Sequence, residues 1–183
     1  MIEAELKARV KDVASVKDWL GKQVAPEAAT YQDVYYDRDD EMTGSDRELR
    51  VRTVSTAQSR RSVLTYKQAR VDEASGSKPE HETEVSNPEA VASFLLDTGY
   101  TEYVRLTKHC QNYAFQFAGY EVLATLVHVP ELDGAFLEVE TLVSEARLHA
   151  ALEALGDLLR ELGLENELES GTYTDAILAA RSR

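Results

Sequence analysis

Residues 2 to 10 alternate apolar and charged side chains without interruption, and this alternation constrains the fold more than any other feature of the chain. A period of two is that of a β-strand, so Glu3, Glu5 and Lys7 share one face of the strand. Ile2 and Leu6 lie on the opposite face. On an open, solvated sheet, like charges two residues apart repel one another and bury no apolar surface. Inside a closed barrel they can hold a polyanion together with its metal ions.

The same charge pattern recurs in other segments that alternate like strands. Acidic pairs occur at Glu82/Glu84 and Glu138/Glu140, and basic side chains occur at Arg50/Arg52, Lys67 and Lys108. Any one of these segments, taken alone, is typical of a solvated strand face. Six such segments in 183 residues favour a charged lumen.

Alternation and turn residues predict eight strands, near residues 2–10, 30–38, 47–55, 60–69, 80–86, 103–118, 120–129 and 135–143. Capping residues and apolar periodicity predict four helices, opened by Asp12, by Asn87-Pro88, by Ser144 and by Thr172. Residues 72–79 are the most turn-like stretch and are expected to form a loop.

We therefore predict an α+β fold, with residues 1–183 as a single domain. A closed, mostly antiparallel eight-stranded β-barrel would form a tunnel, with amphipathic helices packed outside it. Because these helices need an apolar surface to cover, Ile2, Leu6 and Val10 are expected to face outward beneath them. The charged rows then face the lumen.

Composition narrows the range of partners. Acidic residues outnumber basic ones 33 to 20, giving a net charge of −13, and this argues against nucleic acid because neutralising phosphates requires a basic surface. A small anionic ligand is compatible with this negative net charge, because local basic clusters and metal ions can overcome the repulsion from the protein as a whole. No run of 18 apolar residues occurs and the N-terminus is typical of a strand, so neither membrane insertion nor export is indicated. The chain has a single cysteine, Cys110, which excludes internal disulfides and fits a cytoplasmic location. The sequence leaves the oligomeric state open, and a homodimer is one option.

The segment Glu3-x-Glu5-x-Lys7 resembles the ExExK signature of the CYTH, or triphosphate tunnel metalloenzyme, superfamily. Each motif is common by chance when taken alone, but the shared order is specific. The C-terminal segment and the length are most similar to the branch that holds class IV adenylate cyclases and thiamine-triphosphatase-like proteins. The resemblance continues in order along nearly the whole chain, through segments Tyr31–Asp37, Leu49–Arg52, Leu64–Lys67, His81–Glu84, Phe136–Glu140 and Thr172–Asp175.

The resemblance implies roles for the charged positions. In that superfamily carboxylates hold one or two Mg²⁺ or Mn²⁺ ions and basic side chains bind phosphate oxygens, in keeping with the preferences of hard cations and arginine. The metal ligands implied are Glu3, Glu5, Glu138 and Glu140, and the phosphate ligands are Arg50, Arg52, Lys67 and Lys108. The catalytic residues implied are Lys7, Arg52, Lys67 and Lys108, and the other lumen residues are Glu82, Glu84, Tyr35, Cys110 and Tyr173.

Two positions depart from the superfamily's pattern. The family usually has Lys-x-Arg where this chain reads Lys108-His109-Cys110, so a cysteine replaces the arginine. The aspartate expected in the next strand falls on Val127 or His128. Asp133 or His128 would substitute for it only if the strand register shifted, because a slip of one residue reverses the face of every side chain. This chain therefore lacks one phosphate ligand and one metal ligand of the superfamily's pattern.

The activity implied first is that of a class IV adenylate cyclase, which converts ATP to cyclic AMP and pyrophosphate with Mg²⁺ or Mn²⁺. The first alternative is a triphosphatase acting on thiamine triphosphate, tripolyphosphate or a nucleotide. The second alternative is a tunnel protein that binds or transforms another anionic metabolite, since an arginine and an aspartate are missing. All three alternatives take a small anionic molecule as their partner.

Overall fold

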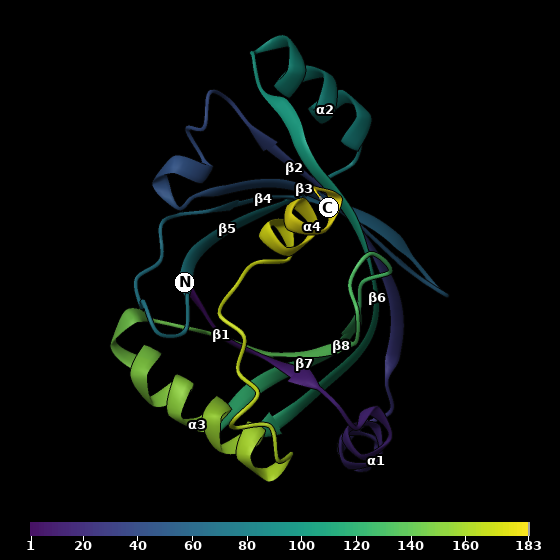
Figure 1. The fold of residues 1–183 in the computed structure, drawn as a ribbon, viewed down its shortest axis with the longest axis vertical. Helices are drawn as coiled ribbons and strands as arrows, with labels where there is room; N and C mark the ends of the chain where they lie inside the picture. The colour runs from purple at the N-terminus through teal and green to yellow at the C-terminus, as the bar shows by residue number, and fades with distance from the viewer. Residues whose placement is uncertain (183) are drawn as a thin grey trace.

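Eight strands close into a barrel that encircles the centre of the molecule in Figure 1. The computed structural model describes residues 1–182, and the strands follow one another around the barrel in the order β1-β5-β4-β3-β2-β6-β7-β8, with every neighbouring pair antiparallel. The predicted α+β fold and closed barrel are confirmed, and strand ends differ from the prediction by at most three residues. The strands are β1 (Ile2–Val10), β2 (Glu27–Asp37), β3 (Glu48–Thr56), β4 (Arg60–Lys67), β5 (Lys78–Val85), β6 (Thr101–Phe117), β7 (Tyr120–His128) and β8 (Ala135–Val143).

In the described part of the chain four α-helices accompany the barrel: α1 (Val13–Gln23), α2 (Pro88–Asp97), α3 (Leu148–Glu161) and α4 (Tyr173–Arg181). The predicted caps Asp12, Asn87 and Thr172 each accept a hydrogen bond from the backbone N–H three residues later. The prediction that Ser144 opens the third α-helix is wrong. A 3₁₀ turn, η2 (Glu145–Arg147), comes first, and Ser144 makes no side-chain capping bond. Within residues 1–182, no helix is both long and apolar enough to cross a membrane.

The outward face of β1 lies beneath α1 and α3, as the amphipathic pattern requires. Ile2 and Val10 are buried in the cluster that α3 covers, and Leu6 packs against it, so the predicted outward placement of these three residues is confirmed. Leu155 of α3 is fully buried in this cluster. Truncating such a leucine to alanine lowers the free energy of unfolding by about 2–5 kcal/mol. The packing of α3 on the outward face of β1 therefore fixes the position of the strand, and with it the charged side chains on the inward face.

The seam between β1 and β5 is open over most of its length. β5 pairs with β1 only at Ile2 and Glu3, whereas β8 pairs with β1 from end to end. Residues 167–169 cover the rest of the free edge. The Arg9 N–H donates to the carbonyl of Glu167, and the N–H of Glu169 donates to the carbonyl of Lys7, each at 2.8 Å. This pairing delivers the start of α4 to one end of the barrel, where Figure 1 shows α4 lying across the opening.

The interior of the barrel has two chemically different regions. We call the first the charged wall, formed by Glu3, Glu5, Lys7, Glu48, Arg50, Arg52, Lys67, Lys78, Glu80, Glu82, Glu138 and Glu140 from β1, β3, β4, β5 and β8. We call the second the apolar wall, formed by Ala29, Val104, Leu106, Cys110, Val127, Val129, Phe136, Tyr173 and Ile177, mainly from β2, β6, β7 and α4. Two charged side chains, Asp33 and Lys108, extend from β2 and β6 toward the charged wall.

Candidate functional site

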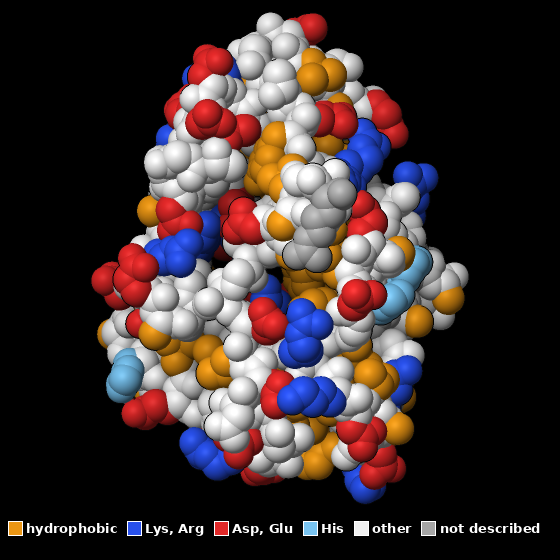
Figure 2. Space-filling view, in the orientation of Figure 1, with side chains coloured by type: hydrophobic (Ala, Val, Ile, Leu, Met, Phe, Trp, Pro, Cys, Tyr) orange, Lys and Arg blue, Asp and Glu red, His pale blue; other side chains and the backbone are white. Residues whose placement is uncertain are grey.

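Two adjacent cavities of about 130 and 160 Å³ follow the charged wall through the barrel. The two cavities share six lining residues, and we call them together the tunnel, which has a mouth at each cavity. The first mouth is bounded by residues 75–78 and 169–174, and the second by the inward ends of β3, β4, β5 and β7. Figure 2 shows a recess near the centre of one face, bordered by acidic and basic side chains. The shared lining residues are Glu3, Glu5, Arg50, Lys67, Lys108 and Glu138.

Three carboxylates converge where β1 pairs with β8, and we call them the acid triad: Glu3, Glu5 and Glu140. Glu5 and Glu140 are direct cross-strand partners, and one carboxylate oxygen from each of the three residues lies within 4.8 Å of the others. Like charges placed opposite each other destabilise a sheet. Burial raises the pKa of Glu5 to about 7, to which the charges of Glu3 and Glu138 add, and it raises the pKa of Glu140 well above its usual range. A divalent cation would relieve this crowding, because hard cations prefer carboxylate oxygen.

Glu138, the fourth predicted metal ligand, has a different partner. Its carboxylate accepts a hydrogen bond of 3.1 Å from the Nζ of Lys108, and both side chains are buried. Burial alone would raise the pKa of Glu138, but the charge of Lys108 brings it below the usual value. The structure therefore brings three of the four predicted metal ligands together and pairs the fourth with a predicted phosphate ligand.

The paired arginines of β3 share one buried acid. Arg52 donates two hydrogen bonds of 2.7 Å to the carboxylate of Asp33, whose exposed fraction is 0%. Arg50 lies 3.9 Å from Asp33 and 3.8 Å from Glu82. Burial would raise the pKa of Asp33, but the two arginines hold it well below its usual range. Sequence reasoning gave Asp33 no role, although it lies directly opposite Arg52 in the β2–β3 register.

Lys67 joins the acid triad to β5. Its Nζ pairs with Glu3 and, at 3.0 Å, with Glu80. Sequence reasoning missed Glu80 because it assigned the acidic pair of this strand to Glu82 and Glu84. Glu82 and Glu84 are both exposed, but Glu82 lines the tunnel at its second mouth and Glu84 lines neither tunnel cavity. Glu84 shares one face of β5 with Glu80 and Glu82, but it lies nearer the end of the strand and is not among the residues that line the two cavities.

A second basic residue of β5 was also missed. Lys78 is buried, and its Nζ lies 2.8 Å from Glu48 and 3.2 Å from Asp46. The sequence placed it in a loop, but β5 begins at Lys78 and continues its alternation with Glu80. That shared parity is the signal that could have placed Lys78 in the lumen.

Two tyrosines of β2 lie beneath the two arginines. The Cζ of Arg52 is 4.7 Å from the ring centroid of Tyr31, and the Cζ of Arg50 is 5.9 Å from that of Tyr35. Tyr35 is buried and also meets the ring of Tyr103 edge-on. Tyr35 therefore lines the first cavity as predicted, but its ring is already in contact with a cation and another ring.

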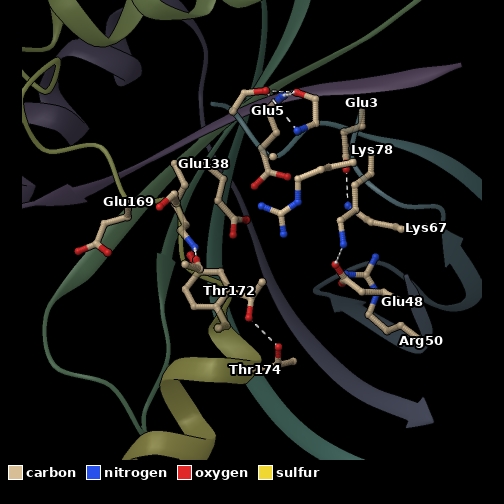
Figure 3. Close-up of a pocket in the computed structure, with 18 of the residues that line it drawn as sticks. Glu3, Glu5, Glu48, Arg50, Lys67, Lys78, Glu138, Glu169, Thr172 and Thr174 are labelled. Atoms are coloured by element: carbon tan, nitrogen blue, oxygen red, sulfur yellow. Dashed lines mark hydrogen bonds and ion pairs between the residues drawn. The ribbon is translucent and has the colours of Figure 1, made fainter. Parts of the chain in front are cut away.

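Tyr173 opens α4 and lies beneath two lysines. The Nζ atoms of Lys7 and Lys108 are 4.5 and 4.2 Å from the centre of its ring, which are cation–π distances. Lys7 also donates to the carbonyl of Gly171, and burial lowers its pKa. Burial, followed by the charge of Glu138, raises the pKa of Tyr173 well above its usual range. Figure 3 shows Glu5 and Glu138 extending into the cavity near the start of α4.

The two departures from the superfamily's pattern are neighbours in space. Cys110 and Val127 are cross-strand partners in the apolar wall, and Val127 has an exposed fraction of 0%. Burial raises the pKa of Cys110 to about 12, so its thiol is neutral. His128 and Asp133 are exposed, and the β7–β8 register runs without a shift. Neither residue therefore replaces the missing aspartate.

Comparison with known proteins agrees with this geometry. The PH1819 protein of Pyrococcus horikoshii OT3 is similar over 99% of both chains, with 28% identity and a TM-score of 0.86. A proposed adenylate cyclase of Vibrio parahaemolyticus is similar over 98% of both chains, with 23% identity and a TM-score of 0.78. A proposed adenylyl cyclase of Hippeastrum with a dominant triphosphatase activity is similar over 97% of this chain and 95% of its own, with 16% identity and a TM-score of 0.66.

At these identities, the Vibrio and Hippeastrum proteins show a shared fold alone. No curated protein matches the sequence significantly. The model of the CYTH domain family matches residues 1–173, and these include the acid triad and every basic residue of the tunnel. The chain therefore belongs to the CYTH domain family.

Proposed function

We propose that this protein is a divalent-metal-dependent triphosphatase that holds the phosphate chain of its substrate in the tunnel. CYTH superfamily enzymes are adenylate cyclase-like or are triphosphatases, and they use divalent metal ions. The observation that carries the proposal is the acid triad, which lies in the same narrow tunnel as Arg50, Arg52, Lys67 and Lys108. Carboxylates for a cation beside basic groups for phosphate oxygens form a site for a metal–polyphosphate complex.

The acid triad fits Mg²⁺ or Mn²⁺ by the chemistry of its donors. Glu3, Glu5 and Glu140 offer carboxylate oxygens within 4.8 Å of one another, and the charges of Lys67 and Lys108 offset only part of their mutual repulsion. A bound ion would neutralise charge on the phosphate oxygens. In our proposal these three residues hold it, and Glu138 stays with Lys108.

The pairing of the tunnel bases explains why a metal would be needed. Within residues 1–182, every basic side chain of the charged wall except Lys7 forms an ion pair with a carboxylate, as Lys108 does. A bare polyanion must displace those carboxylates and then lie beside them. When cations occupy the carboxylates, the bases become available to the phosphate oxygens. Binding of triphosphate should therefore depend on the divalent ion.

The shape of the tunnel favours hydrolysis over cyclisation. Both cavities are small and lined mostly by charged groups, which suits a phosphate chain more than a nucleoside. The rings of Tyr31 and Tyr35 already contact arginines, so neither is free to stack on a base. Phosphoryl transfer to water requires mainly positioning and charge neutralisation, which the tunnel offers. The basic residues would hold the chain while water attacks the terminal phosphorus.

An adenylate cyclase is the second candidate, and the second mouth favours it. Val54, Val63 and Leu123 line that mouth beside Arg52, so a nucleoside attached to the phosphate chain would find apolar contacts there. The fold is shared with the proposed adenylate cyclase of Vibrio parahaemolyticus. In this reaction the ribose 3′-oxygen attacks the α-phosphorus and pyrophosphate leaves.

Product analysis separates the two candidates. Purified protein is incubated with ATP, thiamine triphosphate or tripolyphosphate and with Mg²⁺ or Mn²⁺, and orthophosphate, pyrophosphate and cyclic AMP are quantified. The proposal expects orthophosphate, which Glu5→Gln abolishes while Glu84→Gln, a change of the same type at an exposed position, leaves it intact. Cyclic AMP and pyrophosphate in equal amounts would establish the second candidate instead. Absence of all products would favour a tunnel that binds another anion.

A further inference from the structure

We infer that Tyr173 has two roles in the tunnel. Its ring positions the side chains of Lys7 and Lys108, and its hydroxyl donates a hydrogen bond to the bound phosphate chain. This inference rests on the proposed function, because it assigns part of the substrate contact to the first residue of α4. Figure 3 shows that the first turn of α4, with Thr172 and Thr174, lies next to the cavity that Glu138 enters.

The ring is in contact with two cations from strands that are not neighbours in the barrel. Lys7 lies on β1 and Lys108 on β6, and their Nζ atoms are 4.5 and 4.2 Å from the Tyr173 centroid. Two ammonium groups repel each other, and the face of an aromatic ring attracts both. The ring therefore attracts both lysines to one point of the tunnel. A carboxylate in the same place would neutralise their charge, whereas the ring does not.

The hydroxyl has only a poorly aligned partner for a buried donor. The Oη of Tyr173 is buried and makes no hydrogen bond of good geometry to any residue that the structure describes, and the carboxylate beside it, that of Glu138, already accepts from Lys108 at 3.1 Å. A tyrosine hydroxyl keeps its proton near neutral pH, and an unpaired buried donor destabilises the folded state. Phe136 meets the Tyr173 ring edge-on at 5.3 Å and fills the same apolar wall without a hydroxyl. Phenylalanine would therefore serve packing at least as well, and the hydroxyl is explained by a ligand that accepts its hydrogen bond.

The backbone places Tyr173 at the tunnel independently of its own contacts. Residues 167–169 pair with the free edge of β1, and the Thr172 side chain caps α4 by accepting the N–H of Asp175. Tyr173 consequently lines the first cavity together with Glu5, Lys108 and Glu138. A phosphate oxygen beside Lys108 would lie within reach of the hydroxyl.

The test compares Tyr173→Phe, which removes the hydroxyl alone, with Tyr173→Leu, which also removes the ring. Tyr103→Phe is the matched control, because Tyr103 packs against the same apolar wall and neither of the two lysines contacts its ring. The melting temperature of each metal-free variant is measured by differential scanning fluorimetry, and tripolyphosphate affinity with Mg²⁺ by calorimetry. We expect Tyr173→Phe to melt at or above the parent's temperature while binding about tenfold more weakly, the scale of one hydrogen bond to a charged group. Tyr173→Leu should bind more weakly still, and Tyr103→Phe should bind like the parent.

A purely structural tyrosine cannot lose affinity while gaining stability, so the opposite signs identify ligand contact. Two results would overturn the inference while leaving the proposed function intact. One is parent-like affinity in both Tyr173 variants. The other is a lower melting temperature with unchanged affinity in Tyr173→Phe, which would show that the hydroxyl serves Glu138. If the parent itself binds no tripolyphosphate, the inference fails together with the proposed function.

Discussion

The charged wall and the apolar wall are built on the same inward strand face, yet they hold opposite chemistry. The boundary runs between successive inward positions of single strands. On β8, Phe136 belongs to the apolar wall, whereas Glu138 two residues later belongs to the charged wall. On β6, Lys108 is followed on the same face by Cys110. A small barrel ordinarily fills its interior with apolar side chains, so the charged wall is the part that needs a ligand to explain it.

The two departures from the superfamily's pattern both lie in the apolar wall. Because Cys110 and Val127 are direct cross-strand partners, they amount to one coupled change. Replacing a buried charged pair by packed apolar side chains is often neutral or stabilising, whereas replacing one partner alone is costly. Where the resemblance implies an arginine at Cys110 and an aspartate at Val127 or His128, the structure shows apolar packing of Cys110 against Val127 and an exposed His128, while the acid triad is present.

The largest effect is expected from placing a charge in the apolar wall. Cys110→Arg would bury a guanidinium opposite Val127, and we expect it to lower the free energy of unfolding by about 3–5 kcal/mol. Adding Val127→Asp should recover a substantial part of the loss, because the two positions are paired. Urea denaturation of the parent and the single and double variants measures both. A single variant as stable as the parent would show that the two walls are not chemically distinct.

The next effect tests the buried pair that connects the two regions. Arg52→Ala leaves the fully buried Asp33 with only the more distant Arg50, so we expect a loss of about 2–3 kcal/mol of stability. Arg52→Ala combined with Asp33→Ala should lose less than Arg52→Ala alone, because no carboxylate is then stranded. Denaturation of the three variants checks this order. Equal losses would mean that Asp33 is hydrated rather than held by the arginine.

A smaller effect of opposite sign is expected in the acid triad. Burial raises the pKa of Glu5 from 4.5 to about 7 in the folded protein, so the folded state binds this proton more tightly than the unfolded chain does. The metal-free protein should therefore lose stability as the pH rises from about 4.5 through 7. Glu5→Gln removes this loss and should stabilise the metal-free protein at pH 8 by about 1–2 kcal/mol. Melting curves from pH 5 to 8 would contradict the account if the parent became more stable than the variant at high pH.

The smallest effect compares two acids on one face of β5. Glu80→Gln weakens the ion pair with Lys67 and should cost about 1 kcal/mol. Glu84→Gln changes an exposed side chain and should stay within about 0.5 kcal/mol of the parent. Thermal denaturation of both variants at pH 7 measures the difference. If Glu84→Gln proved the more damaging of the two, the charged wall would extend further along β5 than the structure places it.

The barrel and its charged rows could be predicted because a period of two is a local signal. The shared face of Glu3 and Glu5 follows from the alternation within their own strand alone. The partners could not be predicted, since they depend on which strands meet. Asp33 stood alone between tyrosines in the sequence, and its bond to Arg52 follows from the β2–β3 register. Lys78 preceded a proline in a turn-like stretch, so its place in the lumen became visible only with the start of β5.

The order of charges around the barrel was equally hidden from the sequence. The acid triad unites Glu140 with two residues of β1 because the first and the last strand of the chain are neighbours. Glu138 and Glu140 share one face, but only the barrel assigns the first to Lys108 and the second to the triad. The contrast between the two walls is therefore a property of the closed sheet.

The central claim is that the charged wall is a metal-dependent triphosphate site, and calorimetric titration with tripolyphosphate tests it most directly. The parent is titrated with and without Mn²⁺, alongside Glu140→Gln as the triad variant and Glu84→Gln as the exposed control. The account predicts tight binding by the parent and Glu84→Gln only when Mn²⁺ is present, and binding at least about tenfold weaker by Glu140→Gln. Equal affinity with and without Mn²⁺, unaffected by Glu140→Gln, would contradict it.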